Sequence, residues 1–159
     1  MLGLGVVCLY IFSFLFIFTL QKNFNPLFIM YIYYLIPLSS IVCFVVGILW
    51  YSPFLFGNLW QKEVTLREPS KVLRGRAFVG SFVMMNIMAW GLGWLLHILD
   101  INTYVGGAIF GLKVGGFFIG TSMATNYLYQ NKPILWGIDA VYHILCMGIM
   151  GALIGGLQR

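Results

Sequence analysis

The stretch from Tyr104 to Gly120 reads YVGGAIFGLKVGGFFIG and contains one charged residue, Lys113. The run stays uncharged up to Tyr129, so it is long enough for a transmembrane helix, which needs roughly 20 residues. Similar runs recur along the chain: 61% of its 159 residues are hydrophobic and only 8% are charged. Soluble domains carry about 25% charged residues, so these few charges cannot cover a water-exposed surface. The composition predicts an all-α integral membrane protein.

Four apolar runs, at about 33–51, 77–99, 104–129 and 133–157, have the length of a membrane span. We therefore expect residues 31–159 to form a compact bundle of four transmembrane helices. Residues 1–30 carry an additional N-terminal hydrophobic helix, which no basic residue precedes and no small-residue cleavage site follows. This pattern favours an anchor helix over a signal peptide. A mis-set start is the alternative, because a chain that begins at Met30 would keep all four spans.

One short segment, residues 61–76, holds five basic residues against two acidic ones: Lys62, Arg67, Lys71, Arg74 and Arg76 against Glu63 and Glu68. Short loops rich in Lys and Arg stay on the cytoplasmic side of a membrane. The turn from Asp100 to Thr103 has neither Lys nor Arg, so we expect it outside. We thus expect a multi-pass protein of the cell (inner) membrane. The net charge of +5 is a topology signal, and no nucleic-acid partner is expected.

Glycines recur every four residues in the third and fourth of these spans. Small residues at this spacing let helix backbones approach closely in lipid. The pattern fits packing within one chain, and it also fits a homo-oligomer. The residues concerned are Gly107, Gly111 and Gly115 in one span, and Gly151 and Gly155 in the other. Membrane lipids are the other expected partners.

Polar residues inside the spans form a candidate cluster of Asn86, Lys113, Asp139 and His143. Ionisable groups at membrane depth usually face a protein interior or a water-filled cavity. Asp139 and His143 are four residues apart and share a helix face. From the rise per residue we place all four near one level and predict an ion pair between Lys113 and Asp139. We expect His97 at the outer interface.

The sequence gives no indication of a catalysed reaction, either from its cysteines or from a known catalytic motif. Cys8, Cys43 and Cys146 are scattered through apolar runs, which predicts small buried side chains rather than disulfides or a zinc site. Nucleophile, metalloprotease and phosphate-loop motifs are missing from the sequence. No catalytic, metal or cofactor residues are therefore expected, and no cofactor.

The segment WYSPFLFGNLW at 50–60 resembles the signature of an uncharacterised family of small membrane proteins, domain of unknown function 1761. The likeness covers about residues 33–157, and the resemblance implies about four spans without implying an activity. In physical terms the motif is a sharp exit from the bilayer, with Pro53 ending the helix and aromatic rings at the interface. A lipid or ligand cradle is the alternative. The motif residues are Trp50, Tyr51, Ser52, Pro53, Gly57 and Trp60.

Three functions remain open on these grounds. The leading hypothesis is a non-enzymatic helical bundle that binds or assembles within the bilayer. The second is a small transporter or channel that uses Asn86, Lys113, Asp139 and His143. The third is a lipid-modifying membrane enzyme. A dry cluster in which every polar group is satisfied would favour the first, whereas polar residues lining an aqueous cavity would favour the second.

Overall fold

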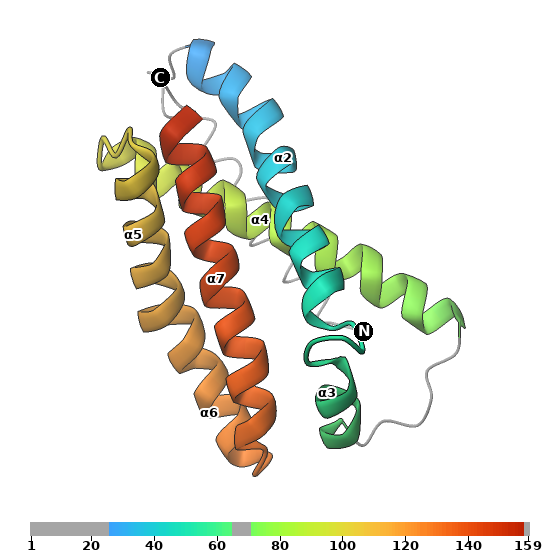
Figure 1. Cartoon of the computed structure of the whole chain (residues 1–159). Helices are drawn as coiled ribbons and strands as arrows, with labels where there is room; N and C mark the ends of the chain where they lie inside the picture. Colours follow the sequence, from blue (N-terminus) through green and yellow to red (C-terminus); the bar gives the residue numbers. More distant parts are fainter. Residues whose placement is uncertain (1–25, 65–70, 158–159) are drawn as a thin grey trace, which may run out of the picture. The chain divides into compact units, whose positions relative to one another are not determined.

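The computed structural model describes residues 26–64 and 71–157, and all regular secondary structure in these ranges is helical (Figure 1). By its internal contacts the chain divides into two units, Met1–Met30 and Tyr31–Arg159. The first unit is described only from Pro26 onward, as the start of a helix. The expected N-terminal helix and Cys8 therefore lie outside the described residues.

The described elements follow the apolar runs of the sequence. In chain order they are α2 (Pro26–Trp50), α3 (Gly57–Glu63), α4 (Lys71–Ile98), α5 (Tyr104–Val114), η1 (Gly115–Gly120), α6 (Thr121–Tyr129) and α7 (Pro133–Leu157). The π-helical η1 joins α5 to α6 without a break. The basic segment 61–76 is less of a loop than expected, because α3 extends to Glu63 and α4 already begins at Lys71.

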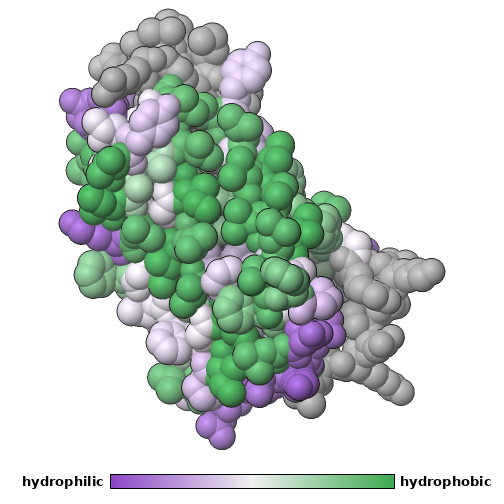
Figure 2. Space-filling model, viewed as in Figure 1, coloured by the Kyte–Doolittle hydropathy of each residue, from purple (hydrophilic) through white to green (hydrophobic). Residues whose placement is uncertain are grey.

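Three helices are long and apolar enough to cross a membrane: Gly75–Ile98, Tyr104–Tyr129 and Pro133–Leu157. The part of α2 from Tyr34 to Trp50 is also apolar but is shorter than these three helices. Large hydrophobic side chains are exposed along these helices, and Figure 2 shows them over much of the visible face. Exposed apolar patches of this extent are unusual for a soluble monomer and typical of a surface that meets lipid. The fold is thus an all-helical bundle suited to a membrane.

The last helix, α7, organises the bundle. Figure 1 shows it between α5 and α2, with α4 crossing behind. It packs against α3, α4, α5, η1 and α6, and it is more buried than either of the other candidate spans. Its Tyr142 hydroxyl lies 3.2 Å from the carbonyl oxygen of Cys43 on α2, to which it donates a hydrogen bond. Most of the core is therefore built around one helix.

Glycines let α5 and α7 approach until their backbones touch. A Cβ atom on Gly107 would lie 2.0 Å from the carbonyl oxygen of Gly151, and one on Gly111 would lie 2.0 Å from that of Met147. Gly155 in turn lies against the backbone of Thr103 and Gly107. These contacts are made within one chain, so the surface that we expected for an oligomer is covered by the chain itself. Association of copies stays a prediction and would need another face.

The two described cysteines are buried and unbridged, as the sequence predicts. The Cys43 thiol donates to the carbonyl oxygen of Cys146 at an Sγ–O distance of 3.4 Å. Both cysteines pack in the apolar core beside Leu92 and Met150. They help to hold α2 against α7.

Candidate functional site

The most polar point of the bundle is the buried carboxylate of Asp139, on the first half of α7. Its Oδ1 accepts hydrogen bonds from the Tyr51 hydroxyl at 2.8 Å and from the indole Nε1 of Trp60 at 3.1 Å. Its Oδ2 accepts a hydrogen bond from the Tyr127 hydroxyl. We call Asp139, Tyr51, Trp60 and Tyr127 the Asp139 cluster. Its three donors come from the α2–α3 corner, from α3 and from α6.

The corner between α2 and α3 positions Tyr51 and Trp60. The Ser52 hydroxyl donates to the carbonyl oxygen of Leu49, and the backbone N–H of Gly57 donates to that of Ser52 at 2.9 Å. A Cβ atom on Gly57 would lie 2.3 Å from the carbonyl oxygen of Tyr51, so only glycine fits this tight reversal. Pro53 suits the corner because it cannot continue a helix. The corner thus returns the chain toward α7.

The aromatic side chains of the motif contact the interior of the bundle and are only partly exposed at its surface. The indole Nε1 of Trp50 donates to the carbonyl oxygen of Ile138 at 3.2 Å, one residue before Asp139. Trp50, Tyr51 and Trp60 are all partly buried, whereas Phe54 at the tip of the corner is 93% exposed. The sequence predicts the three aromatics as interfacial anchors. The structure assigns them hydrogen bonds to α7, because their polar N–H and O–H groups find partners there.

Lys132 ties the same corner to the turn between α6 and α7. Its Nζ donates to the carbonyl oxygen of Glu63 at 2.6 Å, at the last residue of α3. A cation at this position satisfies a terminal carbonyl group and complements the helix dipole. The α3 helix is therefore held at both of its ends, by the corner on one side and by Lys132 on the other.

Tyr127 was not among the residues expected at a site. It lies on α6, just before the tight turn in which Asn131 has a positive φ of 54°. The three-residue connection 130–132 makes α6 and α7 neighbours, and Tyr127 and Asp139 both lie within two helical turns of it. This short connection is the only signal in the sequence, and it does not single out Tyr127. A tyrosine so placed can supply a hydroxyl to a carboxylate on the next helix.

His143 follows Asp139 by one helical turn, as the spacing predicts. Its ring lies 5.1 Å from that of Tyr142, centroid to centroid. Within the described part of the chain, its Nδ1 is a buried side-chain nitrogen without a hydrogen-bond partner. Buried polar atoms are normally paired, so His143 is an exception within the described residues.

Lys113 and Asn86 are not brought to Asp139. Lys113 is exposed, and Asn86 donates to the carbonyl oxygen of Phe82 on its own helix at 2.9 Å. Gly111 faces α7, and a residue two positions further along a helix points the other way. An ion pair with Asp139 would need Lys113 on the packed side of its helix, but that side belongs to Gly107, Gly111 and Gly115. The expected ion pair is thus absent from the described structure. His97 is exposed in the last turn of α4.

The arrangement is that of a buried carboxylate held by three donors of the protein. Each carboxylate oxygen of Asp139 accepts at least one hydrogen bond from the protein itself. Across residues 26–64 and 71–157, no three His, Cys, Asp or Glu side chains gather closely enough to hold a metal ion. The cluster joins three segments to α7. In sequence, Tyr51, Trp60 and Tyr127 are 88, 79 and 12 residues away from Asp139.

A family model described as "Protein of unknown function (DUF1761)" matches residues 35–155. No curated protein and no solved structure matches the chain. The match includes the corner motif, the cluster and most of α7, and it covers more than half of the chain. Residues 35–155 therefore place this chain in the DUF1761 family of proteins of unknown function.

Proposed function

We propose that the chain is a four-span membrane bundle without enzymatic activity, which serves to bind or assemble within the bilayer. In this proposal the Asp139 cluster is the structural lock of the bundle. The observation that carries it is the pairing of both Asp139 oxygens with three donors from the protein itself. A site for substrate turnover would need a free functional group, whereas here the carboxylate already has its partners.

The four spans would be 33–51, 77–99, 104–129 and 133–157, with segment 61–76 in the cytoplasm of a cell (inner) membrane. Two contacts support the sidedness. Lys132 reaches Glu63, which puts the turn before α7 next to the basic segment. Gly155 lies against the carbonyl oxygens of Ile101 and Thr103, which puts the external turn beside the end of α7. The positive charges then assign the first pair of ends to the cytoplasm.

Cysteine accessibility tests this topology. Cys8, Cys43 and Cys146 are first replaced, and then Ser70→Cys and Asn102→Cys are introduced one at a time. A membrane-impermeant thiol reagent added to intact cells should label Asn102→Cys and leave Ser70→Cys unlabelled until the cells are opened. The reverse pattern would refute the orientation, and labelling of both from outside would refute the four-span arrangement.

A second candidate function, proton or ion transport, is favoured by one observation. The unpartnered Nδ1 of His143 lies one turn from Asp139 inside a membrane-spanning helix. Histidine titrates near neutral pH, and intramembrane pairs of this kind can relay protons. Proteoliposomes with a pH-sensitive dye inside separate the two functions. A scaffold should give the same slow proton leak in wild type, His143→Leu and Asp139→Asn, whereas a transporter should lose a fast flux in both variants.

A further inference from the structure

A groove runs along the outer face of α5 and into η1. It has a volume of about 310 Å³ and is lined by Ile109, Leu112, Lys113, Gly116 and Phe117. The lining is apolar except for Lys113. A Cβ atom on Gly116 would meet nothing within 4 Å, so the floor of the groove is open at this glycine. π-helical turns such as η1 are frequent at functional sites.

Lys113 is the unusual member of this lining. Among the described residues its ammonium group has neither a hydrogen bond nor an ion pair, and its side chain is exposed. It lies nine residues after Tyr104, which is about 13 Å into the span. A charged group at this depth is costly unless it finds a partner or reaches water. The groove therefore carries a positive charge that the chain does not neutralise.

A second copy of the chain has few negative charges to offer at the depth of Lys113. The sequence has four acidic residues, and only Asp139 falls within Gly75–Ile98, Tyr104–Tyr129 or Pro133–Leu157. The described helix Tyr34–Trp50 contains none. Asp139 itself is buried and holds three donors. Asp100 of a second copy, at the Tyr104 end, is the competing partner that the dimer mass below would identify. A partner that lies along the groove itself combines a negative charge with apolar surface, as a phospholipid does.

Side-chain direction completes the description of that partner. Helical side chains lean toward the N-terminus of the helix, so the Lys113 stem extends toward the Tyr104 end and its head can reach the headgroup level. Gly116 and Phe117 lie on the other side of Lys113, deeper in the span. The charge is thus near the lipid headgroups and the open apolar floor is near the acyl chains.

We propose that this groove binds one anionic phospholipid of the leaflet at the Tyr104 end. The lipid phosphate pairs with Lys113, and an acyl chain lies over Gly116 against Phe117. The ring of Phe117 is 72% exposed and so is free to contact this acyl chain. This proposal deepens the proposed membrane function by naming a partner class. It rests on the four-span topology only for the assignment of the leaflet.

The test uses the full chain in detergent, freed of lipid and titrated with dioleoyl-phosphatidylglycerol or dioleoyl-phosphatidylcholine. Native mass spectrometry counts bound lipids, and thermal melting reports the stabilisation. Wild type should bind one phosphatidylglycerol more tightly than phosphatidylcholine. Lys113→Met should weaken the phosphatidylglycerol affinity about tenfold, because a charge-assisted hydrogen bond is lost. Lys113→Arg should restore it, since Arg also binds phosphate.

Two matched controls make the result specific to the groove. Lys62→Met removes the same charge from an exposed site on α3 and should leave the affinity unchanged. Gly116→Leu fills the groove floor and should weaken binding while the charge is kept, whereas Gly80→Leu, also in open space, should not. Equal affinity of wild type and Lys113→Met would overturn the proposal. So would a loss of dimer mass in Lys113→Met, which would identify a protein partner. If the cysteine labelling refutes the proposed orientation, the lipid would be assigned to the other leaflet, and the proposed lipid site itself would be unaffected.

Discussion

Replacement of Asp139 tests the Asp139 cluster most directly. Asp139→Leu keeps the branched shape of the side chain and leaves the donors of Tyr51, Trp60 and Tyr127 without their acceptor. Interhelical hydrogen bonds in membrane proteins contribute about 0.6 kcal/mol on average and at most about 1.7. Three of them give a loss of roughly 2 kcal/mol in the free energy of unfolding, with an upper bound of about 5. At about 2–4 °C per kcal/mol, Tm should fall by about 4–8 °C for the lower figure.

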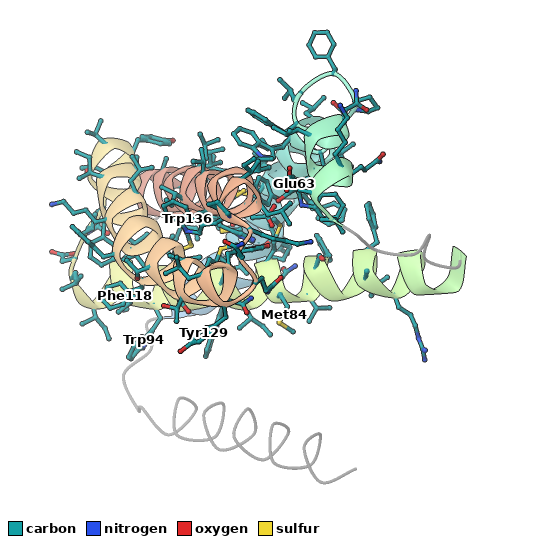
Figure 3. All side chains as sticks on the ribbon, turned by 90° about the horizontal axis from the view of Figure 1, so that it is seen from below. Glu63, Met84, Trp94, Phe118, Tyr129 and Trp136 are labelled. Atoms are coloured by element: carbon teal, nitrogen blue, oxygen red, sulfur yellow. The ribbon has the colours of Figure 1, made fainter. Side chains whose placement is uncertain are left out.

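A double-mutant cycle then separates the hydrogen bonds from general damage. Tyr51→Phe removes one donor and should cost about 0.6 kcal/mol in the wild-type background. In the Asp139→Leu background the same change should cost nothing, because its acceptor is already gone. Tyr129→Phe is the matched control, since Tyr129 is 90% exposed and points away from the bundle (Figure 3). It should be neutral in both backgrounds.

The assay is thermal melting of the full chain in detergent, followed by circular dichroism at a helix band. Asp139→Asn should lose about half as much as Asp139→Leu, because the amide keeps one accepting oxygen. If Tyr51→Phe costs the same with and without Asp139, the two side chains are not coupled. That result would refute the structural lock.

Three further variants test the packing and the division of the chain. Gly107→Ala should lower the free energy of unfolding by about 1–3 kcal/mol, because its Cβ would meet the Gly151 backbone, whereas Gly116→Ala should be neutral or stabilising; melting curves compare the two. Gly57→Ala should cost a similar amount, because its Cβ meets the corner backbone, and shifted tryptophan fluorescence should accompany the loss. Deletion of residues 1–29 should leave a monodisperse helical protein by size exclusion, since they precede the family-matched region; aggregation of the truncated chain alone would contradict this.

The amino-acid sequence was sufficient for the class of fold. Its low charge and long apolar runs leave helices in a membrane as the stable solution, because lipid offers no partners to an open backbone. The helix limits near Trp50, Tyr104, Tyr129 and Pro133 follow from local signals that act within a few residues. The family resemblance was readable for the same reason, since WYSPFLFGNLW is one continuous segment. Features that depend on a few neighbouring residues can therefore be predicted from the sequence.

The partners of Asp139 were decided by the tertiary structure. Its charge and depth made it a candidate, yet the sequence suggested Lys113 as its partner, and the structure instead brings Tyr51 and Trp60 from 88 and 79 residues away. Tyr127 was missed because a lone tyrosine near a helix end has no distinctive pattern. In water a polar face marks the outside of a helix, whereas in lipid the outer and inner faces are both apolar. The helical periodicity of the sequence shows which residues share a helix face. Only the packing around α7 decides which neighbouring helix covers that face.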